Sequence, residues 1–430
     1  MNCLVVGFKI SGKSAAKLLQ TKGHRVFVFD SCQNAKEEII KEGFICINNL
    51  TDDFLKTIHL CVVSPSVRPK SELMCKLKKH CQKVIGELEL GYQYSSGKCY
   101  AITGTNGKTT SVELLKRVLG QKALALGNIG LPITSFVEAK CKVCEVSSFQ
   151  LCTIENFRPQ VAGITYIGVD HLDYHETENE YINAKYNIAK NMCGKDKLVV
   201  NADDENSMKL AFNAKCKIWT YSSVQKCRGA YVENDKIYFI KKNKPRYIMD
   251  TKDIKLVGKH NLNNVLLVVA MAMLIGVKPK TIRKRISTFY GLEHRVQKIA
   301  TIDGVTYIND SKATNISATK VAIESVKDNI ILLLGGYDKG YEYDELVEFL
   351  SVKKVIVFGG VKDKILRAFE RNNFTNYITA ENLKQATQIA KQIAQDGDNV
   401  LLSPASSSHD EFESYKHRGE VFEEYVLSEE

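Results

Sequence analysis

The sequence has no apolar stretch long enough to cross a lipid bilayer. The longest, from Val265 to Val277, has 13 residues, whereas a membrane-spanning helix requires ~18–20. We expect it to form a buried helix. The amino terminus also lacks the order of a secretion signal, because its short apolar run leads directly into Gly7, Lys9 and Lys13. These absences predict a cytoplasmic protein that makes no membrane contact.

Cysteine is present but without a pattern. The 13 cysteines have no repeated spacing, which in a chain without an export signal indicates reduced, mostly buried thiols and no disulfide framework. Cys141 and Cys144 form a single CxxC, and no second pair completes a tetrahedral zinc site. The run CKVCEVS favours a buried strand, with metal or redox use as the alternative.

Hydrolase motifs are missing, since neither GxSxG nor HExxH occurs. No dense basic block interleaved with aromatic residues occurs either, because the lysines behind the net charge of +11 are spread along the chain. Spread positive charge suits small polyanionic substrates such as nucleotides. We therefore expect phosphoryl chemistry on small molecules and no nucleic-acid partner.

The amino-acid composition and length are typical of a folded, multidomain protein. The chain has 430 residues, and single cores usually stop growing near ~250–300. Strand-like and helix-like stretches alternate in three segments, 1–92, 93–291 and 292–430. We predict an α/β fold of three domains: an amino-terminal Rossmann-like domain, a central domain of P-loop type and a carboxyl-terminal Rossmann-like domain. Short alternating runs at 216–257 predict a small extra antiparallel sheet in the central domain.

The first predicted strand is followed by GFKISG, from Gly7 to Gly12, and then by a helix, as in nucleotide-phosphate loops. The pattern is not GxGxxG, since Lys9 occupies the second glycine position. Asp30 ends the second predicted strand, where a dinucleotide-binding fold places a ribose-binding acid. The segment predicts either a dinucleotide site or, as we prefer, a Rossmann-like half-domain whose loop holds another anionic ligand.

The strongest local pattern is TGTNGKTT at residues 103–110, between a predicted strand and a predicted helix. Its glycines let backbone N–H groups approach phosphates, its lysine supplies charge, and its hydroxyl suits Mg²⁺. Only the GK[ST] half of the common P-loop pattern matches, because Ile102 stands at the first glycine position. We predict a phosphate loop formed by Gly104, Thr105, Asn106, Gly107, Lys108, Thr109 and Thr110.

Polar residues also follow other predicted strands of the central domain. Glu145 comes at a strand end, the sheet edge where α/β proteins bind ligands, and suits Mg²⁺. His171, in VDHLDYH, is by its pattern alone a capped or core-edge histidine, and Asp170, Asp173 and His175 compete with it for any role.

Two further features have ordinary structural interpretations. Lys185 lies in a helix-like stretch, where its spacing is typical of a solvated face. Asn261 and Asn264 lie one turn apart at a predicted helix start, where amides either cap the helix or contact an adenine edge. The residues alone leave these alternatives open.

In the third domain, three polar loops follow predicted strands: NDSKATN (309–315), GGYDKG (335–340) and SPASSSHDEFESY (403–415). Loops at the carboxyl ends of parallel strands meet at one edge of the sheet, which predicts a binding cleft there. Lys312 and Lys339, together with the hydroxyls, suit a substrate that carries carboxylates.

Taken together and in this order, the motifs resemble the Mur ligase family over essentially the whole chain. The resemblance rests on TGTNGKTT, GNIG, EVSSFQL, DHLDYH, AKYNIAKN, GKHNLNN, EHR, NDSKATN, GGYDKG and LLSPASSSHDEFESYKHRG. The short amino-terminal domain and SPASSSHDEFESY look most like the D-glutamate-adding members. Cys32 and Tyr415 stand where some members carry arginine and phenylalanine.

The resemblance implies an ATP-dependent ligase of cell-wall synthesis that adds D-glutamate to UDP-N-acetylmuramoyl-L-alanine. The terminal carboxylate is phosphorylated by ATP, the amine of D-glutamate attacks the acyl phosphate, and phosphate leaves. The implied partners are these two small molecules, and the implied cofactors are ATP and two Mg²⁺ ions. We expect a monomer.

The resemblance also implies roles for single residues. Lys108 would hold the β and γ phosphates, Lys312 the transferring phosphate, and Lys185 would be carbamylated to support the second Mg²⁺. The implied metal ligands are Thr109, Glu145, His171 and Lys185. The implied ATP contacts outside the phosphate loop are Asn261, Asn264, Arg295 and Asp310. The implied D-glutamate contacts are Thr314, Lys339, Ser408, His409 and Tyr415. The implied UDP-substrate contacts are Ile10, Ser11, Ser31 and Asn128.

Several alternatives lie close to this interpretation. A diaminopimelate- or lysine-adding member would be expected to carry a DNPR-type motif, which is absent, and a folylpolyglutamate synthase would lack the amino-terminal domain. A nonenzymatic nucleotide-binding regulator would be expected to lose Lys108, Glu145 or Lys185, and all three are present. The imperfect GFKISG loop counts against a dinucleotide-dependent oxidoreductase.

Overall fold

The computed structural model describes residues 1–128, 130–168, 170–242, 244–256, 259–338 and 340–428. The chain forms two compact units, each of which is described by itself. The first comprises Met1–Ile254 and Leu262–Thr288, and the second comprises Lys255–Asn261 and Phe289–Glu430.

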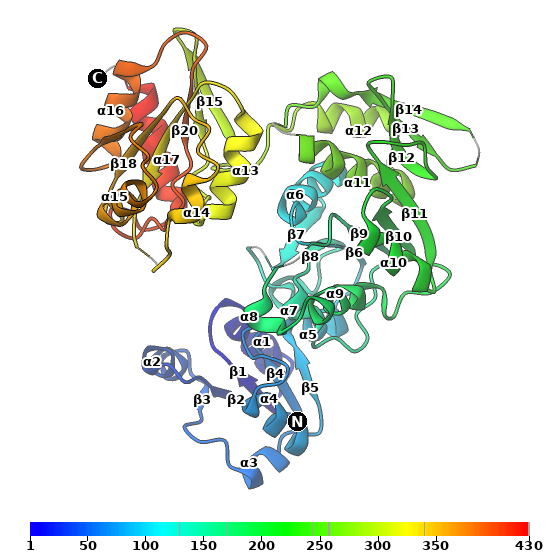
Figure 1. Cartoon of the computed structure of the whole chain (residues 1–430). Coiled ribbons are helices and arrows are strands. Elements are labelled where there is room, and N and C mark those ends of the chain that lie inside the picture. Colours follow the sequence, from blue (N-terminus) through cyan, green and yellow to red (C-terminus); the bar gives the residue numbers. More distant parts are fainter. Residues whose placement is uncertain (129, 169, 243, 257–258, 339, 429–430) are drawn as a thin grey trace. The chain divides into compact units, whose positions relative to one another are not determined.

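The amino-terminal part of the first unit is a five-stranded parallel sheet with helices packed against it (Figure 1). Its strands are β1 (Asn2–Val6), β2 (Arg25–Phe29), β3 (Ile45–Cys46), β4 (Leu60–Val63) and β5 (Val84–Gly86). Its helices are α1 (Ile10–Thr21), α2 (Gln33–Lys41), α3 (Asp52–Lys56), α4 (Glu72–His80) and α5 (Glu87–Tyr94). The order β3-β2-β1-β4-β5 puts β1 in the middle. Because β1 and β4 are covered on both faces, their sequences are continuous apolar runs.

A nine-stranded sheet forms the rest of the first unit. Its strands are β6 (Lys98–Thr103), β7 (Ala123–Gly127), β8 (Cys141–Glu145), β9 (Val161–Ile164), β10 (Lys197–Asn201), β11 (Lys217–Ser222), β12 (Gly229–Glu233), β13 (Lys236–Ile240) and β14 (Pro245–Asp250). The helices are α6 (Lys108–Leu119), α7 (Ser148–Leu151), α8 (Leu172–His175), α9 (Glu178–Tyr186), α10 (Glu205–Asn213), α11 (Lys259–Ile275) and α12 (Pro279–Ile286). Three short 3₁₀ turns are η1 (Ile133–Phe136), η2 (Asn187–Ala189) and η3 (Thr251–Asp253).

The strand order of this sheet is β14-β13-β12-β11-β10-β9-β6-β8-β7. The antiparallel pairs are β12–β13 and β13–β14, so the expected antiparallel strands exist. They continue the main sheet, because β11 and β12 pair in parallel. Gly229 permits this close pairing, since a Cβ there would lie 1.8 Å from the carbonyl oxygen of Thr220.

Two expectations about apolar segments are confirmed in this sheet and its helices. The CxxC of Cys141 and Cys144 lies within β8, as expected of a strand. The longest apolar stretch forms most of α11, and Val265 is fully buried. Among the residues that the structure describes, no helix combines the length and apolarity needed to span a membrane.

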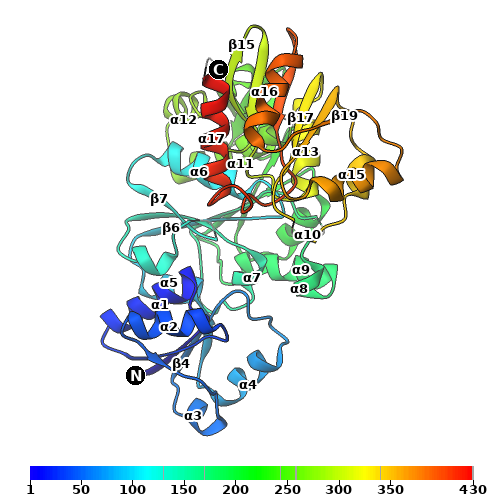
Figure 2. The same ribbon diagram turned by 90° about the vertical axis from the view of Figure 1, so that its left-hand side faces the viewer.

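The second unit is built on a six-stranded sheet of order β15-β16-β20-β17-β18-β19. Its strands are β15 (Gln297–Ile302), β16 (Val305–Asn309), β17 (Ile330–Gly335), β18 (Lys354–Phe358), β19 (Tyr377–Thr379) and β20 (Asn399–Leu402). Its helices are α13 (Ile316–Val326), α14 (Asp344–Val347), α15 (Lys362–Arg371), α16 (Leu383–Ile393) and α17 (Tyr415–Leu427). All pairs are parallel except β15–β16. Helices α16 and α17 pack side by side against this sheet (Figure 2).

Candidate active site

The phosphate loop lies between the end of β6 and the start of α6. Gly104 and Gly107 have positive φ angles of 145° and 83°. A Cβ on Gly104 would lie 1.9 Å from Thr165 Oγ1, and one on Gly107 would lie 2.2 Å from Asn264 Oδ1. Only glycine fits either position. The loop leads into the amino terminus of a helix, whose N–H groups and dipole favour bound phosphate.

Two lysines share one acceptor in this loop. Lys108 donates from Nζ to the carbonyl oxygens of Gly104 (2.8 Å) and Thr105 (2.7 Å), and Lys185 donates to the same Gly104 oxygen at 2.8 Å. Lys185 is only 1% exposed. Its ammonium lies 4.4 Å from the centre of the Tyr181 ring. The interpretation of Lys185 as a solvated helical lysine is therefore wrong, because the side chain turns inward to the loop.

The surroundings of Lys185 favour its neutral form. Burial lowers the pKa of Lys185 to about 7, with a further lowering contribution from the charge of Lys108. The carboxylates of Asp170 and Glu145 oppose this shift without cancelling it. A lysine with so low a pKa has a substantial neutral fraction at neutral pH, and a neutral amine is a nucleophile.

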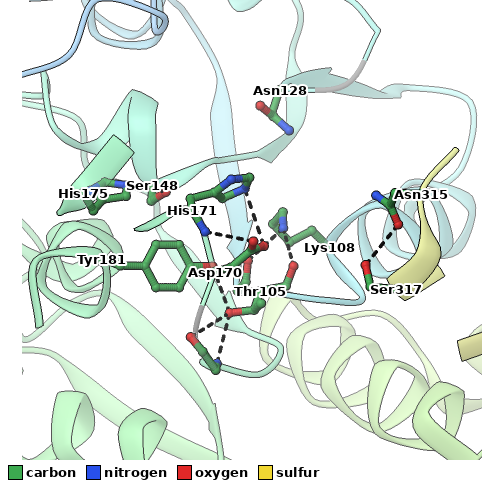
Figure 3. A network of polar contacts seen from close by, with 12 residues as sticks. Thr105, Lys108, Asn128, Ser148, Asp170, His171, His175, Tyr181, Asn315 and Ser317 are labelled. Atoms are coloured by element: carbon green, nitrogen blue, oxygen red, sulfur yellow. Dashed lines mark hydrogen bonds and ion pairs between the residues drawn. The ribbon is translucent and has the colours of Figure 1, made fainter. Parts of the chain in front are cut away.

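Thr105 anchors the loop to α9 and to the segment after β9 (Figure 3). Its Oγ1 lies 2.9 Å from the hydroxyl of Tyr181 and accepts from the N–H of Gly168 at 3.0 Å. Of the other predicted loop residues, Asn106 is exposed, whereas the first turn of α6 buries Thr109 and Thr110. Tyr181 is a supporting residue that the sequence pattern did not distinguish.

Glu145 ends β8, paired with Ile102 of β6, and is 1% exposed. Its Oε1 accepts from Nδ2 of Asn128 at 3.0 Å, and its carbonyl oxygen accepts from the N–H of Asn128 at 2.9 Å. Its Oε2 is buried and has no hydrogen-bond partner within the described part of the chain. A buried carboxylate oxygen without a partner is costly. This atom therefore has the character of a ligand group, and Asn128 orients it.

His171 and His175 differ in burial. His175 is 4% exposed, and its Nε2 lies 2.9 Å from Oγ of Ser148. His171 has a positive φ of 53°, its side chain is 46% exposed, and its Nε2 lies 3.5 Å from the Asp170 carboxylate. Its ring also contacts Phe149 at a centroid distance of 4.8 Å. The core-edge interpretation thus suits His175, whereas His171 is accessible to a ligand (Figure 3).

The residues around Glu145 fit Mg²⁺ better than a metal held entirely by protein. Over the described residues, no group of three or more His, Cys, Asp or Glu side chains gathers as a metal site. Mg²⁺ needs few protein ligands, because phosphate oxygens and water complete its octahedral shell. The unpartnered Glu145 oxygen and the Thr109 hydroxyl are hard oxygen donors of this kind. The side chain of Asp173 lies outside the described set.

Asn264 lies beyond the first turn of α11, which begins at Lys259. Its side chain is buried, and its Oδ1 accepts from Oγ of Ser111 at 3.3 Å. The helix-capping interpretation is therefore wrong for Asn264, whose amide packs against Gly107 of the phosphate loop. Contacts of Asn261 and Asn264 with adenine stay predictions.

The GFKISG loop connects β1 to α1. Asp30 supports it, because its Oδ2 accepts from the N–H of Phe8 at 2.7 Å and its Oδ1 from the N–H of Cys32 at 2.9 Å. A Cβ on Gly12 would lie 1.8 Å from the Gly7 carbonyl oxygen, so α1 touches the loop. Of the predicted UDP-substrate contacts, Ile10 and Ser11 lie in the first turn of α1, and Ser31 lies in the turn after β2. The fourth, Asn128, contacts Glu145.

The second unit brings together the three predicted polar loops. They follow β16, β20 and β17, which are adjacent parallel strands, so the prediction of a shared sheet edge is confirmed. The ammonium of Lys312 lies 5.7 Å from the centre of the Tyr415 ring. The other predicted residues on these loops are Asp310, Thr314, Ser408 and His409. Lys339 lies outside the described residues.

Asp310 is a buried acid at this edge. Its Oδ2 accepts from Oγ of Ser403 at 2.7 Å, and its Oδ1 accepts from the N–H of Val296 at 3.1 Å. Burial raises the pKa of Asp310 to about 7, although these hydrogen bonds and the charge of Arg295 work in the opposite direction. Asp310 therefore ties the turn that carries Arg295 to the sheet.

Arg418 on α17 is a buried structural support of these loops that sequence reasoning missed. It is fully buried, and burial lowers its pKa to about 10. Its guanidinium donates to the carbonyl oxygens of Ser311 (2.9 Å), Ser406 (3.1 Å) and Ser407 (2.9 Å). It thereby clamps the loop after β16 to the loop after β20. An arginine in a helix of mixed charge resembles a solvated residue, so the position of Arg418 in the sequence did not predict its burial.

Known proteins match this chain over nearly its whole length. The family model described as Mur ligase middle domain matches residues 102–272, and the one described as Mur ligase, glutamate ligase domain matches residues 294–406. A protein of Koribacter versatilis named UDP-N-acetylmuramoylalanine--D-glutamate ligase is 40% identical over 439 residues, covering 98% of this chain and 96% of that protein. A protein of the same name from Caldicellulosiruptor bescii is 36% identical over 445 residues, covering 99% and 97%.

Solved structures share the architecture at low sequence identity. A UDP-N-acetylmuramate-alanine ligase of Thermotoga maritima has a TM-score of 0.60 at 17% identity, with 100% of both chains covered. A pseudomurein peptide ligase type C of Methanothermus fervidus has a TM-score of 0.59 at 19% identity, covering 98% of this chain and 99% of that one. The similarity to these solved structures shows a shared fold, whereas the sequence similarity to the two ligases above covers nearly the whole chain. The chain belongs to the Mur ligase family.

Proposed function

We propose that this protein is an ATP-dependent ligase that joins D-glutamate to UDP-N-acetylmuramoyl-L-alanine in peptidoglycan synthesis. The observation that carries the proposal is its identity of 36–40%, over nearly the full length, to ligases of that name. The phosphate loop, with Lys108 at the start of α6 and Glu145 at the neighbouring strand end, supports the use of ATP.

Lys108 and the N–H groups at the start of α6 would hold the phosphates of ATP and stabilise the charge that develops during transfer. A carboxylate oxygen of the UDP-substrate attacks the γ-phosphorus, the bond to the β-phosphate oxygen breaks, and ADP leaves. The amine nitrogen of D-glutamate then attacks the acyl carbon and loses a proton. The carbon–oxygen bond to phosphate breaks, which leaves an amide and inorganic phosphate.

Lys185 is the proposed site of carbamylation. Its pKa of about 7 supports this role, because only a neutral amine attacks CO₂. A bond forms from Nζ to the carbon of CO₂ and one proton is released, so a buried neutral amine becomes a carbamate anion. Bound Mg²⁺ supplies positive charge to the phosphate oxygens. Two such ions would be held by Thr109, Glu145, His171 and the modified Lys185.

The second unit would bind D-glutamate and the far side of the nucleotide. Hydroxyls and positive charges at its loop edge suit the two carboxylates of D-glutamate. The proposed D-glutamate contacts are Thr314, Lys339, Ser408, His409 and Tyr415. The proposed nucleotide contacts are Asn261, Arg295 and Asp310 of the second unit, with Lys312 on the transferring phosphate, together with Asn264 of the first unit.

The division of labour along the chain is also a proposal. Residues 1–92 would bind the UDP moiety through Ile10, Ser11 and Ser31, with Asn128 contributing from the central domain, 93–291. Residues 292–430 would bind the amino acid. We propose a cytoplasmic monomer that, through cell-wall synthesis, contributes to cell shape and division.

The test is a complete reaction with analysis of the product. The purified protein is incubated with UDP-N-acetylmuramoyl-L-alanine, ATP, Mg²⁺ and D-glutamate, and the product mass is measured. A product heavier by one glutamyl residue, formed with one ADP per molecule, supports the proposal. ATP consumption without that product overturns it. Lys108→Ala should abolish the product, whereas Lys116→Ala, on the surface of the same helix, should not.

A further inference from the structure

The positive charge of the chain is concentrated in one part of the first unit. Segments 215–254 and 276–288 contain 15 lysines and arginines but only 4 aspartates and glutamates, so they carry the whole net charge of +11. The rest of the chain has 45 basic and 45 acidic residues, which balance. Lysines occur along the whole chain, but their excess over acids is local. None of the residues assigned above to the phosphate loop or to substrates lies in these segments.

Many of these basic residues gather at one edge of the nine-stranded sheet. The strands β6, β9, β10, β11 and β12 are parallel, so their amino ends lie opposite the phosphate loop, which follows the carboxyl end of β6. β13 and β14 are antiparallel, so the end of β13 and the start of β14 lie at the same edge as those amino ends. The basic edge is defined here by nine residues at these strand ends: Lys195, Lys197, Lys215, Lys217, Arg228, Lys241, Lys242, Lys244 and Arg246.

The four acids of these segments lie at the other edge of the sheet. Glu233 ends β12 and Asp235 precedes β13. Asp250 ends β14, paired with Lys236 at the start of β13, and Asp253 follows in η3. Over the part of the chain that the structure describes, no acid forms an ion pair with a residue of the basic edge. The positive charge of the edge is therefore not neutralised by these acids.

Like charges lie close together along the basic edge. Lys197 and Lys217 are directly opposite each other in the β10–β11 ladder, where like charges destabilise a sheet. Burial lowers the pKa of Lys197, and the nearby charges of Lys241 and Lys217 lower it further. Asp196, the acid next to Lys197, is already paired with Arg158 at 2.7 Å. A bound polyanion would relieve this repulsion.

The side chains of the basic edge suit a broad anionic surface better than nucleic acid. Seven of the nine residues are lysines, and all but Lys197 are exposed. Lysine carries a compact charge on a flexible stem, so each can follow a separate headgroup. The aromatic rings nearby are covered, since Arg228 lies 4.5 Å from the centre of the Trp219 ring and Arg283 lies 4.7 Å from that of Tyr247. Single-stranded nucleic acid requires accessible rings on which bases stack.

We propose that the basic edge docks the protein onto an anionic lipid bilayer. The contact is adsorption of lysines to lipid phosphates, without insertion of apolar side chains. The phosphate loop lies at the opposite edge of the same sheet, so docking does not cover it. The proposal revises the expectation of a protein without membrane contact, because that expectation considered apolar stretches alone. It goes beyond the ligase activity and does not depend on it.

The test is co-sedimentation of the purified full chain with lipid vesicles. Vesicles of phosphatidylcholine alone are compared with vesicles that also contain about 30% phosphatidylglycerol, because anionic lipids create the negative surface potential. We expect binding to the anionic vesicles only. Because salt screens such a contact, the partition coefficient should fall at least about tenfold when the salt concentration rises from about 0.05 M to about 0.5 M.

Paired charge reversals separate the basic edge from net charge. Each basic residue near an anionic membrane strengthens binding about fivefold, so Lys217→Glu combined with Lys241→Glu should weaken it at least about 25-fold. Lys41→Glu combined with Lys384→Glu, at exposed positions of α2 and α16, changes the net charge equally and should bind like wild type. Both double variants should keep the wild-type melting temperature and the wild-type turnover without vesicles.

A second double variant guards against a folding defect. If Lys217→Glu combined with Lys241→Glu lowers the melting temperature, Lys242→Glu combined with Lys244→Glu repeats the test outside any strand. The expected loss of binding is the same.

Several outcomes would overturn the proposal. They are equal binding of neutral and anionic vesicles, no binding of either, and an equal loss in the edge and control variants. Tighter binding of duplex DNA or single-stranded RNA than of anionic vesicles at the same salt concentration would assign the edge to nucleic acid instead. Turnover is measured separately, so a lack of D-glutamate-dependent activity in wild type refutes the proposed function without affecting the docking result.

Discussion

Lys185 donates a hydrogen bond to the carbonyl oxygen of Gly104, 81 residues earlier in the chain, over 2.8 Å. The same oxygen accepts from Lys108. Two ammonium groups that share one acceptor repel each other, and the repulsion is stronger in a buried environment than in water. A phosphate bound by Lys108 would relieve it, and so would conversion of Lys185 to a carbamate. The loop thus favours an anionic ligand, and the contact is consistent with the proposed carbamylation of Lys185.

Lys185→Ala tests the proposed carbamylation of Lys185. Alanine has no amine to carbamylate, so we expect D-glutamate-dependent phosphate release to fall at least about 100-fold, as when a group that stabilises charge in a transition state is removed. Added formate or acetate should restore part of it by supplying the missing carboxylate. Lys190→Ala, a nearby exposed lysine, is the control. Full activity without added acid would contradict the role of Lys185.

Asn128→Ala tests whether Asn128 orients Glu145. The substitution removes the 3.0 Å hydrogen bond to Oε1, and a hydrogen bond to a charged group contributes about 1.5–3 kcal/mol. We therefore expect the Mg²⁺ concentration for half-maximal activity to rise about tenfold or more. Asn213→Ala, on the surface of α10, should behave as wild type. If only KM for the UDP-substrate rises, Asn128 serves that substrate alone.

Gly107→Ala tests the geometry of the phosphate loop. Alanine at a φ of 83° is strained by about 1–2 kcal/mol, and its Cβ would meet Asn264. We expect a lower melting temperature and weaker ATP binding by at least about tenfold, measured by calorimetry. Gly194→Ala is the matched control, since no atom lies within 4 Å of its added Cβ. Equal ATP affinity in both variants would contradict the assigned loop.

Asp310→Asn tests a pH dependence of stability. Burial raises the pKa of Asp310 from 3.8 to about 7, so between these values the folded chain keeps a proton that the unfolded chain releases. The free energy of unfolding of the wild type therefore falls as pH rises through this window. Asparagine carries no such proton.

We expect the second unit to unfold at a higher melting temperature in Asp310→Asn than in the wild type. The difference should grow from pH 4 to pH 8 and reach about 3 °C or more at pH 8. Asp363→Asn, at an exposed position of α15, should show no such trend. A difference that is constant across this pH range would mean that Asp310 is already ionised in the folded protein.

Much of the fold was predictable because its signals are local. The strands LCVV of β4 and IILLLG of β17 are short apolar runs between turns, and such runs indicate strands buried on both faces. The phosphate loop was predictable for the same reason, since glycines, lysine and threonine are consecutive. By contrast, the continuity of β12 with the main sheet depends on the contact of Gly229 with Thr220, which no short window contains.

The supporting residues of the site were not predictable from spacing. Lys185 is buried because α9 lies against a loop far away in the sequence, and its helix has no strong apolar face that would mark it. Arg418 owes its importance to main-chain carbonyls of other loops. Family resemblance supplied Lys185, but neither resemblance nor periodicity supplied Arg418.

Phosphate release from ATP in the presence of UDP-N-acetylmuramoyl-L-alanine tests the central claim most directly. The same enzyme preparation is assayed with D-glutamate, L-glutamate, L-lysine and meso-diaminopimelate. We expect release with D-glutamate alone, because the loops of the second unit carry the residues proposed to select it. Release with another of the four amino acids, or with none of them, would contradict the assignment of this chain as a D-glutamate ligase.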